Sequence, residues 1–220
     1  MHAVAIDGPA GAGKSTIAKL VAQNMGYIYV DTGAMYRAMA LFIFRENIDP
    51  SDSAAISKVC QEADISIEYE NGEQIILLNG ENVNAFLRTE EVGNMASVSS
   101  VNADVRKKLV QLQQKLASRK NVVMDGRDIG TCVLPEADVK IYLTASSYVR
   151  AKRRYDELVA RGEEGNLEEI EKDIIDRDHR DMTREISPLK QAEDAYLIDS
   201  SDMTIEEVAQ AIMDRCKAIE

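Results

Sequence analysis

The sequence predicts an α/β fold, with a five-stranded parallel sheet and helices on both of its faces. Three observations lead to this prediction. Short apolar runs alternate along the chain with segments of helical periodicity. A glycine-rich loop joins the first apolar run to the first helical segment. The chain has 220 residues, 45% of them hydrophobic, which is enough for one buried core.

The expected strands are short and contain runs of apolar residues, as strands buried on both faces of a parallel sheet do. They cover residues 2–7, 27–31, 121–126, 137–145 and 195–204. The expected helices have apolar residues three or four positions apart, for example Met35, Met39 and Phe42. The first helix ends at Gly26, the second follows residue 31, and the others cover 104–118, 147–184 with a break near Gly162 and Gly165, and 204–219.

Residues 65–78 have a different pattern. Two strand-like runs flank Asn71-Gly72, and Asn79-Gly80 follows them. Asn-Gly pairs favour the tight turns of β-hairpins. We therefore expect a single domain, residues 1–220, in which an insert over residues 33–116 carries a small antiparallel sheet.

Composition narrows the possible functions. No apolar run approaches the ~18 residues of a membrane span, so we expect a cytoplasmic protein that is not bound to a membrane. The net charge of −12 argues against binding a nucleic-acid polymer. Cys60, Cys132 and Cys216 lack metal-site spacing, and we expect all three to be buried thiols. We also expect a monomer.

Residues 8–15, Gly-Pro-Ala-Gly-Ala-Gly-Lys-Ser, match the phosphate-loop pattern G-x-x-x-x-G-K-[ST] in full. A strand before the loop and a helix after it are typical of P-loop NTPases. In such loops backbone N–H groups surround phosphate, the lysine reaches the β- and γ-phosphates, and the serine hydroxyl binds Mg²⁺. The residues expected to bind ATP are Gly8, Pro9, Ala10, Gly11, Ala12, Gly13, Lys14, Ser15 and Thr16.

Asp125 ends the third expected strand and is a candidate acid near Mg²⁺, beside Ser15. The loop by itself leaves motor ATPases, regulatory GTPases and small-molecule kinases open. The Asp-x-x-Gly and Asn-Lys-x-Asp motifs of GTPases are missing from the sequence, and Asp125 lacks the second acid of motor ATPases.

A surplus of arginine favours a kinase. Arg37 and Arg127 each follow an expected strand, where ligands of parallel sheets bind. Arg150, Arg153 and Arg154 are spaced to share one helix face, as are Arg177, Asp181 and Arg184. An enzyme that joins two anions must neutralise both and must exclude water. Residues 150–186 are therefore expected to form a helical, arginine-rich lid.

Five stretches together resemble the bacterial cytidylate kinases, a family of nucleoside monophosphate kinases. They are IDGPAGAGKST, DTGAMYR, DGRDIGT, KIYLTASSYVRAKRR and RDHRDMTR, and the resemblance spans nearly the whole chain, from Ile6 to Asp199. DTGAMYR and DGRDIGT are far more specific than the phosphate loop. The resemblance implies that the insert binds the nucleoside monophosphate.

The resemblance also implies roles for single residues. Arg37 and Arg127 would hold the acceptor phosphate, and Thr32 would contribute to its pocket. Ser97, Arg106 and Asp128 would read cytosine, with Ser99 and Ser100 as alternatives to Ser97. Asp181, supported by Arg177 and Arg184, would contact the pentose, and Arg153 would bind the transferring phosphoryl group.

The expected reaction is reversible transfer of the ATP γ-phosphoryl group to CMP or dCMP, with Lys14, Mg²⁺ and the arginines neutralising charge. A carboxylate paired with a guanidinium matches the N4 donor and N3 acceptor of cytosine, so CMP is expected to be preferred over UMP. Two alternatives are another small-molecule kinase with a P-loop and a switch protein that hydrolyses ATP.

Overall fold

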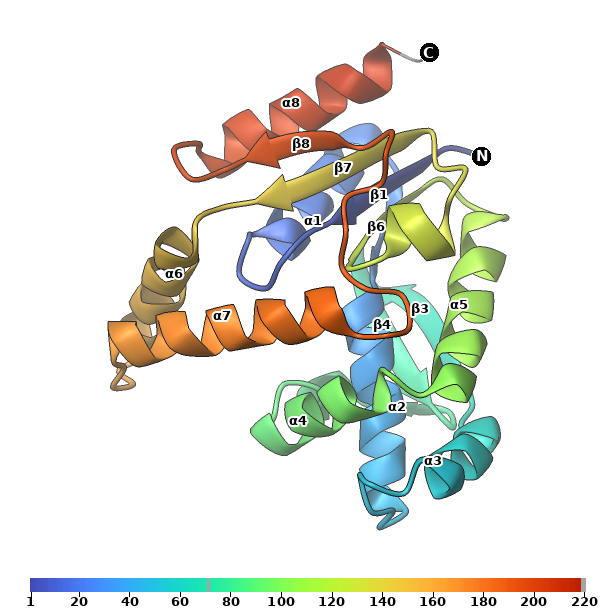
Figure 1. Cartoon of the computed structure of the whole chain (residues 1–220). Coiled ribbons are helices and arrows are strands. Elements are labelled where there is room, and N and C mark those ends of the chain that lie inside the picture. Colours follow the sequence, from blue (N-terminus) through green and yellow to red (C-terminus); the bar gives the residue numbers. More distant parts are fainter. Residues whose placement is uncertain (71, 219–220) are drawn as a thin grey trace. The chain divides into compact units, whose positions relative to one another are not determined.

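The computed structural model describes residues 1–70 and 72–218. Its contacts divide the chain into two compact units (Figure 1). The sheet unit comprises His2–Tyr29 and the chain from Asn121 onward, and the inserted unit is Val30–Lys120. The chain passes from the first to the second within strand β2.

The main sheet has five strands in the order β2-β6-β1-β7-β8. Strand β1 pairs in parallel with β6 and β7, and β7 pairs in parallel with β8, which confirms the predicted parallel sheet. The strands are β1 (Ala3–Asp7), β2 (Ile28–Asp31), β6 (Val122–Gly126), β7 (Val139–Thr144) and β8 (Tyr196–Asp199). The helices of the sheet unit are α1 (Lys14–Met25), the π-helix η3 (Ile129–Val133), α6 (Ser147–Ala160), α7 (Leu167–Thr183) and α8 (Ile205–Lys217).

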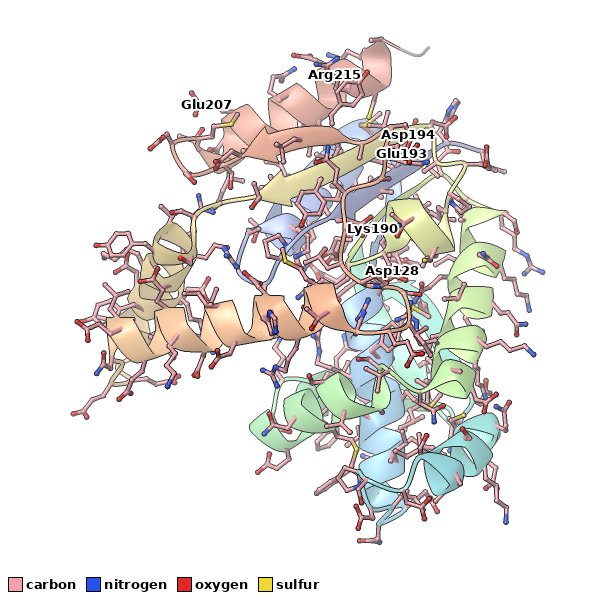
Figure 2. All side chains as sticks on the ribbon, in the orientation of Figure 1. Asp128, Lys190, Glu193, Asp194, Glu207 and Arg215 are labelled. Atoms are coloured by element: carbon pink, nitrogen blue, oxygen red, sulfur yellow. The ribbon has the colours of Figure 1, made fainter. Side chains whose placement is uncertain are left out.

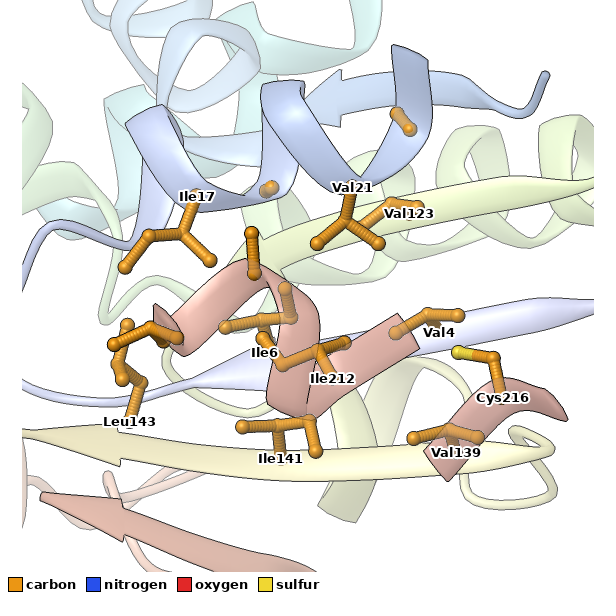
Figure 3. Close-up of a cluster of buried hydrophobic side chains, with 14 of the residues drawn as sticks. Val4, Ile6, Ile17, Val21, Val123, Val139, Ile141, Leu143, Ile212 and Cys216 are labelled. Carbon is orange, nitrogen blue, oxygen red and sulfur yellow. The ribbon is translucent and has the colours of Figure 1, made fainter. Parts of the chain in front are cut away.

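The core of the sheet unit lies between the sheet and two helices, α1 and α8. Val21 of α1 and Ile212 of α8 are fully buried and pack with Ile6 of β1 and Ile141 of β7 (Figure 3). Each such side chain contributes about 1.5–3 kcal/mol when it leaves water. This packing holds the strands in a register in which Asp7 lies beside Gly126 and Tyr142, so the strands end along one edge.

The inserted unit contains the small antiparallel sheet that the Asn-Gly pairs predict. Its elements are α2 (Thr32–Arg45), α3 (Ser53–Val59), η1 (Cys60–Glu62), β3 (Ile65–Glu70), β4 (Glu73–Leu78), β5 (Glu81–Asn82), η2 (Asn84–Phe86), α4 (Glu90–Ser99) and α5 (Ala103–Ala117). Asn79 and Gly80 form the β4–β5 turn with φ of 50° and 81°. The other predicted turn residue, Asn71, lies outside the described residues.

Helix α2 confirms the predicted pattern, since Met35, Met39 and Phe42 are all buried. The charged stretch 147–184 divides into α6 and α7, as expected. The last strand is shorter than expected, because Ser201 turns back onto Asp199 and Thr204 caps α8 by a capping box with Glu207. Among the described residues, no helix is long and apolar enough to cross a bilayer.

One of the predictions made from spacing is wrong. Cys60 and Cys216 are buried, but Cys132 is exposed on the short π-helix η3. Helix α7 carries Arg177 and Asp181 and ends at Thr183, with Arg184 as its C-cap. The Arg184 N–H still donates to the carbonyl oxygen of Arg180, and its ψ of 142° turns the chain after it out of the helix.

Candidate active site

The phosphate loop leaves the end of β1 and enters α1. Gly8 cannot be replaced by a larger residue, because a Cβ there would lie 1.9 Å from the carbonyl oxygen of Leu143 on β7. Gly13 precedes α1, and no side chain caps this helix start in the described chain. The first N–H groups of α1 are therefore left for an anion, and the positive end of the helix dipole favours one.

Lys14 is buried within the loop, and its Nζ donates to the carbonyl oxygen of Pro9 at 2.7 Å. Burial, and after it the charge of Arg127, lower the pKa of Lys14 to about 7, while Asp125 and Asp7 act in the opposite direction. Phosphate oxygens would replace the lost hydration and favour the charged form. A bound anion would therefore stabilise the charged form of this lysine.

Ser15 and Asp125 come together at the end of β6, as the metal-site prediction requires. The Ser15 hydroxyl donates to Asp125 Oδ2 at 3.0 Å, and the Tyr29 hydroxyl donates to Asp125 Oδ1 at 2.8 Å. A hydroxyl and a buried carboxylate beside a phosphate loop are the oxygen donors that Mg²⁺ prefers. Tyr29 does not stand out in the sequence, where it is one residue of a strand. Its hydrogen bond orients the carboxylate.

Arg127 and Asp128 follow β6 directly and meet the end of α7. Arg127 Nε donates to Asp181 Oδ2 at 2.8 Å, and Arg184 Nη2 lies 3.6 Å from Asp128 Oδ1. Asp128 lies between β6 and η3 (Figure 2). The structure thus joins four of the predicted acceptor residues in two ion pairs. Each pair presents a guanidinium and a carboxylate side by side.

The three arginines of α6 contact different parts of the protein, although their spacing suggests one shared contact. Arg150 is buried and donates to the carbonyl oxygens of Ala10, in the phosphate loop, and Ala145, at 3.0 and 2.9 Å. Arg153 donates to Ser200, at the end of β8, at 2.7 Å. Arg154 is exposed and faces Glu157.

Arg150 also pairs with Asp178 of α7, with Nη2 and Oδ2 2.7 Å apart. It thereby links the phosphate loop to both helices of the expected lid. Nothing in the sequence distinguishes it from Arg153, because all three arginines occupy one short run.

Arg177 is exposed on α7, and its charge contributes to the lowered pKa of Lys14.

In the inserted unit, the DTGAMYR motif forms the end of β2 and the start of α2. Asp31 caps α2 by accepting from the Ala34 N–H at 2.8 Å, and its other oxygen lies 3.2 Å from Arg37 Nη2. Thr32 is buried in the first turn. Arg106 of α5 is buried, with its guanidinium 5.7 Å from the centre of the Tyr36 ring.

The three candidate serines lie at the C-terminal end of α4 and differ in exposure. Ser97 is exposed, and its carbonyl oxygen accepts from the Ser100 hydroxyl at 3.0 Å. Ser99 is fully buried. A ligand could reach Ser97 without movement of α4, whereas Ser99 would have to leave the packed interior. Exposure therefore favours Ser97 over Ser99 as the residue that contacts the base.

Solved structures with this fold include several kinases. A gluconokinase from Sinorhizobium meliloti is 14% identical, with a TM-score of 0.50 over 99% of this chain and 93% of that chain. A shikimate kinase from Bacteroides thetaiotaomicron is also 14% identical, with a TM-score of 0.50 over 98% of both chains. At this level of identity the likeness shows the fold alone.

Sequence relatives show the family. The model of the cytidylate kinase family matches residues 4–218. Cytidylate kinases from Caldicellulosiruptor bescii and Bacillus subtilis are 50% and 46% identical over 211 residues. Each match covers 96% of this chain, and 93% and 94% of those proteins. With a phosphate loop, a buried loop lysine and paired arginines and carboxylates after β6, this chain belongs to the cytidylate kinase family.

Proposed function

We propose that this protein transfers the γ-phosphoryl group of ATP to CMP or dCMP, reversibly, giving ADP and CDP or dCDP. Family membership supports a phosphotransferase that uses ATP. The observation that carries the acceptor assignment is the pair of contacts after β6, Arg127 with Asp181 and Asp128 with Arg184. Arg127 and Asp128 follow β6 at the same edge of the sheet at which the phosphate loop follows β1.

The donor half of the site is the loop that contains Lys14. Its N–H groups and the Lys14 ammonium would bind the phosphates of ATP. Ser15 and Asp125 would hold Mg²⁺, because they already place a hydroxyl and a carboxylate 3.0 Å apart. When bound, the ion would neutralise charge on the β- and γ-phosphates. Arg150 would keep the loop in shape through the Ala10 carbonyl.

The acceptor half would use the arginines and carboxylates of the specific motifs. Arg37 and Arg127 would bind the CMP phosphate, with Thr32 contributing to the pocket, and Asp181, supported by Arg177 and Arg184, would contact the pentose. Asp128, Arg106 and Ser97 would read the base. Cytosine offers an N4 donor to a carboxylate, whereas uracil has an acceptor there. An unmatched buried carboxylate costs about 1–3 kcal/mol, or up to roughly a hundredfold in preference.

Transfer requires no general base. The CMP phosphate is largely dianionic at neutral pH, because its second pKa is about 6. The protein therefore acts by holding donor and acceptor in line and by neutralising the transferring charge, with Lys14, Arg127 and Arg153 as the residues proposed to contact it. The arginine-rich segment 150–186 would close over the phosphates and exclude water.

Release of ADP measured in parallel with CMP, dCMP, UMP and AMP tests this function. We expect turnover with CMP and dCMP to exceed that with UMP, and little release without an acceptor. Release that is independent of any acceptor would identify an ATPase, and preference for another acceptor would identify a different kinase. A monomeric state and a cytoplasmic location remain predictions, which size-exclusion chromatography and cell fractionation test.

A further inference from the structure

Asp7, the last residue of β1, is a buried carboxylate that the proposed mechanism does not use. Its Oδ1 accepts from the N–H of Ile129 and its Oδ2 from the N–H of Gly130, each at 2.7 Å. These are the first two residues of the π-helix η3, whose internal hydrogen bonds begin with the N–H of Cys132. Asp7 therefore caps η3 from 122 positions away in the sequence.

Asp128 is the residue at which such a cap is ordinarily found. It occupies the N-cap position of η3, and an aspartate there normally accepts from the N–H groups one turn into its own helix. In this structure Asp128 makes no capping hydrogen bond. Its carboxylate instead lies 3.6 Å from the guanidinium of Arg184. The two aspartates are close enough that the charge of Asp128 acts on Asp7.

We propose that Asp7 is a positioning residue for acceptor recognition, which caps η3 in place of Asp128 and so holds the Asp128 carboxylate toward Arg184. This inference rests on the proposed role of Asp128 in reading the base. Without Asp7, the N–H groups of η3 would draw the Asp128 carboxylate onto its own helix start. The Asp128 carboxylate could then no longer contact the ligand, although Asp128 and Arg184 would both still be present.

Gly130 of the DGRDIGT motif lies against this contact. A Cβ on Gly130 would lie at an ordinary van der Waals distance of 3.4 Å from Asp7 Oδ2 and at a tighter 3.2 Å from Lys140 Cδ. Lys140 is itself held by Asp194, whose carboxylate lies 2.7 Å from its ammonium nitrogen. The start of η3 is therefore closely packed between Asp7 and Lys140.

The test compares kcat/KM for CMP with that for UMP in the wild type, Asp7→Asn, Asp128→Ala and the double variant. Both reactions use the same donor site, so any effect of Asp7 on ATP binding cancels in the ratio. Asparagine keeps one acceptor and turns an NH₂ group toward the second N–H. We expect Asp7→Asn to lower the ratio about fivefold to tenfold, and to have no further effect on the ratio in the Asp128→Ala background.

Asp138→Asn is the matched control, because Asp138 also accepts a backbone N–H, that of Ala3 at 2.7 Å, at the opposite end of β1. We expect it to leave the ratio unchanged. An Asp7→Asn enzyme that is slower with both acceptors but keeps the wild-type ratio would overturn the inference. So would an equal fall in the ratio when Asp128 is already alanine.

If Asp7→Asn does not fold, Asp7→Ser decides the question, because its shorter side chain removes the carboxylate from the N–H groups of Ile129 and Gly130. A lower CMP/UMP ratio supports the positioning role, and an unchanged ratio overturns it. A different result would contradict the proposed function. A wild-type protein that does not phosphorylate CMP contradicts the function, whereas a CMP-preferring wild type with indifferent variants contradicts this inference alone.

Discussion

Arg150, which is buried, and Asp178, which is half-buried, form an ion pair that joins α6 to α7, with 2.7 Å between Nη2 and Oδ2. The same guanidinium donates to the carbonyl oxygen of Ala10. One side chain thus connects the phosphate loop to α7, the helix that carries Asp181. Because both charges are shielded from water, neither can be removed alone without leaving the other uncompensated.

Arg150→Met is therefore expected to lower the free energy of unfolding by about 3–5 kcal/mol, and to raise KM for ATP. Arg154→Met, four residues along the same helix, is the control. The Arg154 side chain is 52% exposed and pairs with an exposed glutamate, so the change should be within about 0.5 kcal/mol. Chemical denaturation measures both, and equal effects would contradict the role of Arg150.

Lys14→Ala is expected to reduce phosphoryl transfer by at least about a hundredfold, because the transferring phosphate loses a preorganised positive charge. Stability should not fall, since the buried ammonium is disfavoured in the folded state. Lys19→Ala, at an exposed position of the same helix, should keep its activity. Coupled ADP release and thermal unfolding test these outcomes. Turnover retained by Lys14→Ala would remove this lysine from the mechanism.

Asp128→Ala should reduce the preference for CMP over UMP, by up to roughly a hundredfold, because it removes the carboxylate that we propose accepts from cytosine N4. The measurement is kcat/KM for each acceptor at saturating ATP. A variant that keeps the wild-type preference would show that another residue reads the base.

Stability should depend on pH through Asp7. Burial raises the pKa of its carboxyl from 3.8 to about 6, against the lowering effect of the two N–H donors. Between these values the folded protein binds the proton more tightly than the unfolded chain. The resulting stabilisation is fully present below pH 3.8 and is lost as pH rises through about 6, a change of about 3 kcal/mol.

Asp7→Asn lacks this titration. We would measure the free energy of unfolding of the wild type and of Asp7→Asn in urea, from about pH 4 to about pH 7.5. As pH rises, the wild type should lose stability relative to the variant. Asp138→Asn provides the control for the substitution itself. A difference that stays constant with pH would mean that Asp7 has an ordinary pKa in the folded state.

Cys132 should be the fast-reacting thiol among the cysteines at 60, 132 and 216. It is exposed on η3, whereas Cys60 and Cys216 are buried, and burial raises the pKa of the Cys60 thiol. A thiol reagent added to native protein should modify about one equivalent rapidly, and Cys132→Ser should abolish that phase. Rapid modification of the serine variant would show that a buried cysteine is accessible.

Local sequence patterns by themselves determined much of this protein. The phosphate loop is one contiguous run whose geometry depends on its own glycines and the helix after it. The parallel sheet is predicted by the alternation of apolar strands with helices, and the β4–β5 turn by Asn79-Gly80. Each of these depends on neighbours within a few positions, so residue type and spacing are sufficient to predict it.

Contacts between residues far apart in the sequence were decided by the tertiary structure alone. Arg150 and Arg153 are three positions apart, yet one points to the phosphate loop and the other to Ser200. Their directions depend on where β7 ends relative to β1 and β8. Asp7 caps a helix 122 positions away, and Arg184, the C-cap of α7, lies beside Asp128, which follows β6. Sheet register and helix ends determine these contacts, and local periodicity carries no information about them.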